Sequence, residues 1–326
     1  MCVTVLMRNA DACCPPHDIS RGANEADRRI DRYTGPASWV PFGQPGRSTR
    51  EVTSAMMGRS RGTICPAMLS NPPGFSHQRQ ELMVDPQVLE ELKKYDTPSI
   101  TNVVATYPEH PLCLGLYNPW SENWYTDQTI HCMYPELGAL CGYAVTCVFG
   151  LPDPTFKRLT FMEIVDALDA SPKPTILALE QKFPPEIAGK VGLAGGNMTA
   201  AMQALNCVGC ISNGPSRDID EIRPMGFQYH ISGITPGHGA QAVHSVNAPV
   251  HIAGMDVAPG EIIHMDENGA CKFPADCAEK VLENVIKLLE EEGDRIGQLQ
   301  KASSAAEIRA IFGGKGYAAT GDDGDE

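Results

Sequence analysis

The sequence predicts an α/β layered domain with a single core over roughly residues 80 to 295. Short apolar, β-branched runs alternate with stretches of helical spacing in the middle of this region, which is typical of strands alternating with helices. Further strand-like runs follow one another later in the chain. At 326 residues the chain is long enough for one large domain or two ordinary ones, and it shows no internal repeat.

The expected elements follow one another in a regular order from Pro86 onward. The first helix has Asp85 as its N-cap, and Gly293 is a candidate C-terminal stop for the last. Residues 109–131 contain Trp120 and Trp124 among glycine, proline and asparagine, and are predicted to form a long ordered loop or insertion. Helical spacing occurs at 86–95, 99–107, 160–170, 195–206 and 276–293, and strand-like runs occur at 142–150, 174–180, 207–212, 227–235, 249–254 and 261–266.

Both ends of the chain differ from this core. Residues 1–78 are rich in Arg, Pro, Gly and Ser and contain no lysine; such a composition buries too little apolar surface to offset the entropy of ordering, so we predict a disordered leader. A transit peptide would be poor in acids, whereas this stretch contains Asp11, Asp18, Glu25, Asp27 and Asp31. Residues 79–295 form the predicted domain, and 296–326 form a C-terminal extension with an acidic tail.

Composition limits the classes of partner and the compartment. A formal net charge of -14 argues against nucleic acid or an anionic membrane surface as the main partner. No apolar run approaches the roughly 20 residues of a membrane-spanning helix, and the first residues are too polar for a signal peptide. Cysteines scattered through apolar runs suit a reducing cytoplasm. Cys207 and Cys210 have CxxC spacing, but without a second pair they are predicted to be core residues rather than a redox or zinc site.

Two strand-to-helix corners carry the candidate chemistry. The first is Gly195-Gly196-Asn197-Met198, where glycine lets the backbone approach a ligand and the first helical amides point outward toward an anion. The second is the stretch NGPSRDIDEI, residues 213–222. If the two preceding strands are neighbours, both corners lie at the edge where open α/β sheets bind ligands.

The adjacent Arg217 and Asp218 in the second corner allow two interpretations. Asp218 could simply cap a helix, with Glu221 three residues on as in a capping box and Arg217 in solvent. Alternatively, Arg217 holds an anion and Asp218 holds a metal ion, and together with the first corner they form a pocket of backbone donors, one guanidinium and one carboxylate.

The run GGNMTAAMQALNCVGCISNGPSRD resembles the signature of the family that holds 4-hydroxy-4-methyl-2-oxoglutarate aldolases and the regulator of ribonuclease activity A, the RraA-like family. Further similarities, over roughly residues 85–290, are GYAVTCVFG, TPSITNVV and the closing VNAPVHIAGMDVAPGEIIHMDENGACKFP. The chain departs from the family pattern at Asn102, Asn213 and Glu261, and in the aromatic segment 109–131. None of these departures touches the Gly195 corner, Arg217 or Asp218, but they leave the substrate open.

The resemblance implies a layered β/β/α sandwich of the RraA-like, phosphohistidine-swivelling-domain-like type. It also implies an enzyme that cleaves a C–C bond in an α-keto acid to give pyruvate, as an aldolase or an oxaloacetate decarboxylase. Asp218 would anchor Mg²⁺ or another divalent metal such as Mn²⁺. Arg217 and the amides of Gly195, Gly196, Asn197 and Met198 would bind the oxo-acid substrate, with Arg217 and Asp218 as the catalytic pair.

The resemblance further implies a homotrimer or a dimer of trimers, with an acid from a neighbouring subunit reaching the site. Glu290, Glu291 and Glu292 lie in a suitable region, although a solvated helix face also explains them. No lysine lies between Gly195 and Asp218, which disfavours a Schiff base. The alternative function is a non-catalytic regulator that binds a ribonuclease.

The histidines of the last third are predicted to be structural or surface residues, because their spacing matches no helical metal-binding pair. The glycine-rich GITPGHGAQ, residues 233–241, does not open a helix as a phosphate loop does, and it is predicted to be a loop near the pocket. The histidines concerned are His230, His238, His244, His251 and His264.

Overall fold

The computed structural model of the chain describes residues 83–105, 110–118, 121–155 and 159–313, all within one compact unit. The predicted leader, residues 1–78, lies outside the described residues, as does the acidic end of the tail. Within the described part of the chain, no helix is long and apolar enough to cross a membrane.

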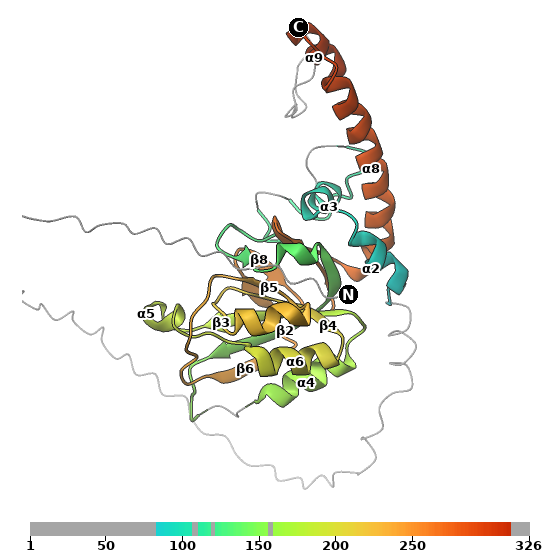
Figure 1. Cartoon of the computed structure of the whole chain (residues 1–326). Coiled ribbons are helices and arrows are strands. Elements are labelled where there is room, and N and C mark those ends of the chain that lie inside the picture. Colours follow the sequence, from blue (N-terminus) through green and yellow to red (C-terminus); the bar gives the residue numbers. More distant parts are fainter. Residues whose placement is uncertain (1–82, 106–109, 119–120, 156–158, 314–326) are drawn as a thin grey trace, which may run out of the picture. The chain divides into compact units, whose positions relative to one another are not determined.

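A mixed sheet with β2 near its centre forms the core of the fold (Figure 1). On one side of β2 the strands β3, β4 and β5 run parallel to it in that order. On its other side, β9 pairs with the first residues of β2 and β6 with the last, both antiparallel. The bounds are β2 Leu140–Gly150, β3 Thr175–Lys182, β4 Cys207–Ser212, β5 Gln228–Ile231, β6 Ala242–Val246 and β9 Ile262–Asp266.

The described part of the predicted insertion, residues 110–118 and 121–131, reaches both edges of this sheet, and Trp120 lies outside the described residues. Residues 124–126 pair with the outer strand β10, Gly269–Phe273, through Lys272 N–H to Trp124 O at 3.0 Å and Thr126 N–H to Ala270 O at 2.9 Å. A few residues later, β1, His131–Cys132, pairs antiparallel with β5 at the opposite edge. The insertion therefore bridges the two edges and makes the sheet nearly closed, like a barrel.

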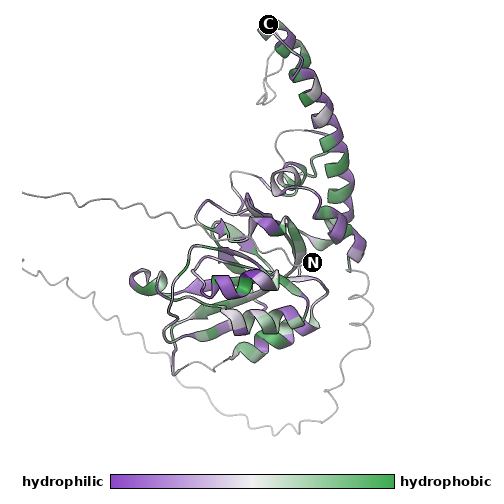
Figure 2. Ribbon diagram, viewed as in Figure 1, coloured by the Kyte–Doolittle hydropathy of each residue, from purple (hydrophilic) through white to green (hydrophobic). Residues whose placement is uncertain are grey.

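Two further layers cover the two faces of the sheet and confirm the β/β/α sandwich. The hairpin of β7, Val250–Ile252, and β8, Met255–Val257, packs on one face. The helices α4, Phe161–Ala170, and α6, Gly196–Ala204, pack on the other. Figure 2 shows hydrophobic residues running along the central strands, whereas the helices carry both kinds. This layering leaves the carboxyl ends of β3 and β4 free to carry the two corners.

A helical group packs against the start of β2 and against β10. It comprises α2, Pro86–Leu92, α3, Thr97–Val104, and α8, Ala278–Leu299. Asp85 caps α2 as predicted, accepting from Gln87 N–H at 2.9 Å. The predicted stop at Gly293 is wrong, because α8 continues through it to Leu299. A helix interior tolerates glycine at a cost of about 1 kcal/mol, and Gly293 does not adopt the positive φ of a terminating cap.

Shorter helical elements complete the described residues. They are α5 Pro185–Ala188, α7 Ile219–Ile222, α9 Ala305–Ile311 and 3₁₀ turns at Pro135–Leu137, Arg223–Met225 and Ala275–Cys277.

The predicted core role of the CxxC cysteines is confirmed, since Cys207 and Cys210 are buried, free thiols. A register shift places two residues of β4 opposite one of β3 at this point, so both side chains face the same apolar cluster. Burial raises the pKa of the Cys207 thiol to about 11, which leaves it a small hydrophobic group at neutral pH.

Candidate functional site

The structure brings the two predicted corners into direct contact. Leu193, just before the first corner, bridges to Ser216, just before Arg217, as in a parallel ladder. Leu193 N–H donates to Pro215 O at 3.2 Å, and Ser216 Oγ–H donates to Leu193 O at 2.7 Å. The prediction that both corners share one edge of the sheet is therefore confirmed.

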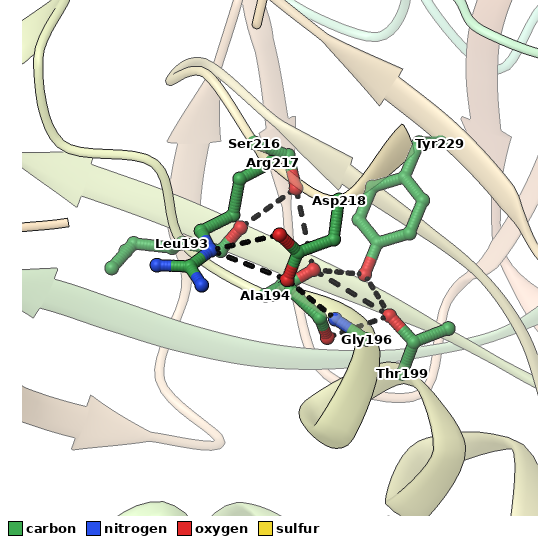
Figure 3. A network of polar contacts seen from close by, with 9 residues as sticks. Leu193, Ala194, Gly196, Thr199, Ser216, Arg217, Asp218 and Tyr229 are labelled. Atoms are coloured by element: carbon green, nitrogen blue, oxygen red, sulfur yellow. Dashed lines mark hydrogen bonds and ion pairs between the residues drawn. The ribbon is translucent and has the colours of Figure 1, made fainter. Parts of the chain in front are cut away.

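Two buried side chains that the sequence analysis did not identify stabilise the first corner through hydrogen bonds. Tyr229 Oη donates to Ala194 O at 2.7 Å and lies 2.7 Å from Thr199 Oγ1 (Figure 3). Both side chains are buried, and burial raises the pKa of Tyr229, so the phenol stays a neutral donor. These bonds fix the backbone at Ala194, whose positive φ of 55° turns the chain into α6.

The amides that open α6 have different partners. Gly196 N–H donates to Asp218 Oδ2 at 3.1 Å. The first N–H groups of a helix have no acceptor within the helix and need a partner from outside it. Among the described residues no acceptor is found for the N–H groups of Asn197 and Met198. Asn197 is exposed and Met198 is half-buried. These two donors remain available to an anion.

Asp218 does not cap the helix that follows it, so that part of the capping interpretation is wrong. The residue adopts a left-handed conformation, φ 60°, and its side chain makes no capping bond to α7. The carboxylate instead reaches back to Gly196 and caps the start of α6. Glu221 does not complete a capping box either; its carboxylate lies over Gly196, where an added Cβ would come within 2.4 Å of Glu221 Oε1.

Arg217 lies beside Asp218 and contacts it through the Nε–H edge of its guanidinium. Arg217 Nε–H is 3.2 Å from each carboxylate oxygen of Asp218. The side chains are 33% and 28% exposed respectively, so solutes can reach both. Figure 3 shows the terminal nitrogens of Arg217 pointing away from Asp218, and no described residue accepts a bond from them. They present two free NH₂ groups beside a carboxylate.

Gly195 is required by this arrangement. A Cβ at this position would lie 2.3 Å from Asp218 Oδ2 and 3.3 Å from Arg217 Cγ. The glycine therefore makes room for the ion pair to lie directly against the backbone of the first corner.

The donor set around Asp218 fits a hydrated hard cation and not a closed zinc site. Oδ2 of the carboxylate accepts from Gly196 N–H, and Arg217 Nε–H is shared between Oδ1 and Oδ2. Oδ1 therefore retains a free lone pair. The described residues contain no group of three or more His, Cys, Asp or Glu that could hold a metal ion. Mg²⁺ commonly uses one or two carboxylates and keeps several waters.

The glycine-rich loop lies next to the corners, as predicted. Gly192 N–H donates to Gly237 O at 2.8 Å, and Thr235 N–H donates to Ser216 O at 3.0 Å. The loop thus lies alongside the second corner, where Ile234 bridges to Ser216.

The histidines of the last third make structural or surface contacts, as expected. His230 and His264 are buried and bond to Asp266 O and to Thr97 Oγ1. His251 is exposed and pairs with Asp256 at 2.6 Å.

The two acidic features noted in the sequence have partners within the chain. Glu261, a departure from the family pattern, forms a largely buried ion pair with Lys272 at 2.9 Å. In the run Glu290–Glu292, Glu291 lies 3.2 Å from His110, at an exposed position on α8.

Comparison with known proteins agrees with this fold. Residues 118–271 match the family described as RraA-like: Aldolase/RraA. The curated Protein DlpA of Legionella pneumophila is 26% identical over 136 residues, which span 40% of this chain and only 21% of that protein.

Two solved structures share the fold at low sequence identity. An uncharacterized protein from Pseudomonas syringae pv. tomato aligns with a TM-score of 0.54 and 17% identity, covering 70% of this chain and 94% of that one. RraAS2 of Streptomyces coelicolor, described as an unusual member of the RNase ES inhibitor RraA protein family, aligns with a TM-score of 0.50 and 17% identity over 66% of this chain and 99% of that one. With the matched residues 118–271, the β/β/α layers and the joined Gly195 and Arg217 corners, the chain contains an RraA-like domain.

Proposed function

We propose that the protein is a divalent-metal-dependent lyase that cleaves a C–C bond in an α-keto acid to give pyruvate, acting as a 4-hydroxy-4-methyl-2-oxoglutarate aldolase, an oxaloacetate decarboxylase, or both. The observation that carries the proposal is the Arg217–Asp218 pair against the start of α6, with the terminal nitrogens of Arg217 and one lone pair of Asp218 Oδ1 still free. The match of residues 118–271 to a family described as Aldolase/RraA supports it.

Arg217 and the first turn of α6 suit a substrate carboxylate. The planar guanidinium presents donors in a fork that matches a carboxylate. The free N–H groups of Asn197 and Met198 add donors at the positive end of the helix. Together these groups hold one end of an oxo acid and fix the orientation of its keto group.

Asp218 would hold the metal ion through Oδ1, with water completing the coordination. When bound, Mg²⁺ or Mn²⁺ would supply Lewis-acid stabilisation at the keto oxygen of the substrate. The bond from Gly196 N–H keeps the Asp218 carboxylate oriented, and Arg217 Nε–H offsets part of its charge. Removing one of these bonds would loosen the carboxylate that the ion needs.

The charges in the site fit the reaction. In a retro-aldol cleavage or a decarboxylation, the electron pair of the broken bond moves toward the keto group and leaves the enolate of pyruvate. Arg217 stabilises this developing negative charge because its guanidinium is fixed before the reaction begins. In the retro-aldol cleavage the hydroxyl group gives up its proton to solvent and the second product leaves as a carbonyl compound, whereas in the decarboxylation it leaves as CO₂. In both reactions the enolate then takes up a proton from solvent.

The test is an assay of pyruvate release from oxaloacetate and from 4-hydroxy-2-oxo acids, with and without Mg²⁺ after exhaustive chelation. We expect turnover only with the metal. Full turnover after chelation would contradict the proposal, and so would an adduct trapped by borohydride, because a trapped adduct signals a Schiff base.

The alternative is a non-catalytic protein that binds a ribonuclease, in line with the assignment of RraAS2 to the RNase ES inhibitor RraA protein family. It predicts no pyruvate release from any oxo acid, together with inhibition of a ribonuclease by the purified chain.

A trimeric assembly with a neighbour's acid at the site belongs to the same proposal as the lyase. Sedimentation analysis, combined with Glu290→Gln, Glu291→Gln and Glu292→Gln, tests it.

A further inference from the structure

Gln181, at the end of β3, is a buried polar side chain at a position where the sheet alone would favour an apolar one. It follows Leu177 and Leu179 at the two-residue spacing of a strand face, and those leucines belong to the apolar cluster under α4 and α6. Gln181 is 7% exposed. Its Oε1 atom is buried and has no hydrogen-bond partner among the described residues.

The side-chain amide of Gln181 bonds at the junction of the two corners. Gln181 Nε2–H donates to Pro215 O at 3.1 Å. The same carbonyl accepts from Leu193 N–H at 3.2 Å. Leu193 lies two residues before Gly195, and Pro215 lies two residues before Arg217, so this one carbonyl ties both corners to β3.

The turn between β4 and Arg217 is fastened to Gln181 at two more places. Asn213 Oδ1 accepts from Gln181 N–H at 2.7 Å, and Asn213 Nδ2–H donates to Gln181 O at 3.1 Å. An aspartate could accept the first bond but could not donate the second. A Cβ on Gly214 would lie 1.9 Å from Gln181 Cδ, so the amide is pressed directly against the turn.

Stability does not account for an amide at this place. A buried acceptor without a partner costs free energy, and an apolar side chain of similar shape would avoid that cost. The bond to Pro215 O therefore contributes mainly to the geometry of the turn.

We propose that Gln181 is a positioning residue for the reaction proposed above: it fixes the Pro215 carbonyl so that the guanidinium of Arg217 faces the substrate carboxylate. The inference rests on that proposed function for its effect on substrate, and on the geometry above for its effect on the turn. Gln181 acts through Arg217 and does not itself contact the reacting atoms.

Gln181→Met is the first test, because methionine matches glutamine in length and lacks the donor and the acceptor. We expect an unchanged or raised midpoint of urea unfolding and a KM for the oxo acid raised about tenfold, with a smaller change in kcat. In the Arg217→Ala background, Gln181→Met should raise KM no further, since residues acting as a unit are not additive. A lowered midpoint with unchanged KM, or equal effects in both backgrounds, would show a merely structural role.

Hydrogen exchange of the backbone amides gives a readout that needs no activity. In Gln181→Met the amides of Gly214, Ser216, Arg217, Asp218 and Leu193 should exchange at least several-fold faster than in the wild type. Asn213→Asp, an exposed position that keeps one of the two bonds, should give a smaller increase in the same amides. Gln203→Met is the matched control, since Gln203 is an exposed glutamine whose amide donates to Met225 O, away from the corners.

The outcomes separate the two proposals. If the wild type releases no pyruvate, the proposed function fails, and the exchange rates still decide whether Gln181 holds the turn. If the wild type is active and exchange in residues 214–218 is unchanged in Gln181→Met, the inference about Gln181 is overturned alone.

Discussion

Asp218 shows how a single residue can join two segments that are distant in sequence. It lies in a left-handed conformation, which aspartate and asparagine adopt more readily than other residues with a Cβ. Its carboxylate bonds to Gly196, 22 residues earlier in the chain. The charge of the side chain and its role as a cap are therefore separable by substitution.

Asp218→Ala should destabilise the fold by about 1–2 kcal/mol, since it removes the cap on α6 and places alanine at a positive φ. Asp218→Asn keeps an acceptor oxygen and tolerates that φ, so its free energy of unfolding should stay within about 0.5 kcal/mol of the wild type. Urea unfolding followed by circular dichroism measures both. Equal losses in the two variants would show that the charge, and not the cap, carries the stability.

At this scale the sequence identified the residues with distinctive chemistry and missed their supports. Gly195, Arg217 and Asp218 stand out because a strand end, a glycine pair and an opposite-charge pair follow in order. Thr199 and Tyr229 do not stand out, because a threonine in a helix and a tyrosine in a strand are ordinary core residues until a contact shows what their hydroxyl groups bind.

Among the elements, β2 and α6 determine where the site lies. The long β2 pairs with both β6 and β9 along one edge. Its other edge pairs with the parallel strands that carry both corners. The sequence predicted these parallel strands because they are apolar and buried. It missed β6, β8 and β10, whose short, partly exposed runs contain histidine, aspartate or lysine and are recognised as strands only when a partner is present.

The start of α6 gives a matched pair of glycine substitutions. Gly195→Ala would place a Cβ 2.3 Å from Asp218 Oδ2 and displace the carboxylate that is held by the backbone, so we expect catalytic efficiency to fall at least about tenfold. Gly196→Ala would meet the end of the Glu221 side chain, which is exposed and can move away.

Steady-state kinetics and urea unfolding of the two variants distinguish these effects. We expect Gly196→Ala to stay within about threefold of the wild type in kcat/KM, since its only close contact is a movable side chain. An equal loss of activity in both variants would contradict this account. It would mean that any added side chain in this corner lowers activity, whether or not it displaces Asp218.

For the molecule as a whole, the packing of α3 against β9 introduces buried polar groups whose protonation is linked to folding. His264 on β9 lies 2.9 Å from Thr97 Oγ1 and donates from Nε2 to Leu92 O at 3.1 Å. Asp266 accepts from Thr97 N–H at 2.7 Å. Burial lowers the pKa of His264, against the smaller opposing effects of the nearby Asp266 and Asp96. The folded protein therefore keeps this imidazole neutral.

Stability should consequently fall as the pH drops below about 6.5, the ordinary pKa of histidine. In that range the unfolded chain binds a proton at His264 that the folded protein excludes, so unfolding is favoured by acid. Relative to the wild type, His264→Gln should lose less stability between pH 7.5 and 5.5, by roughly 1 kcal/mol. His238→Gln, at an exposed loop position, is the control; an identical pH dependence in His264→Gln and the wild type would contradict this account.

The closure of the sheet could not be predicted from the sequence. Composition indicated an ordered insertion at residues 109–131, but its pairing with β10 and β5 joins segments about 100 or more residues apart in the chain. Such contacts leave no local periodicity. The layered fold class was predictable because each layer has its own apolar pattern and because the motifs resemble a known family.

The central claim is that Arg217 and Asp218 hold the two parts of one complex, the substrate carboxylate and its metal ion. The most direct measurement is the magnesium dependence of pyruvate release by the wild type, Arg217→Ala and Asp218→Ala. A charge-assisted bond contributes roughly 1.5–3 kcal/mol, so Arg217→Ala should lose at least about tenfold in kcat/KM, and Asp218→Ala should lose more. Excess Mg²⁺ should partly restore Asp218→Ala and should not restore Arg217→Ala. Near-wild-type turnover in Asp218→Ala, with only the stability loss of a missing cap, would contradict the claim.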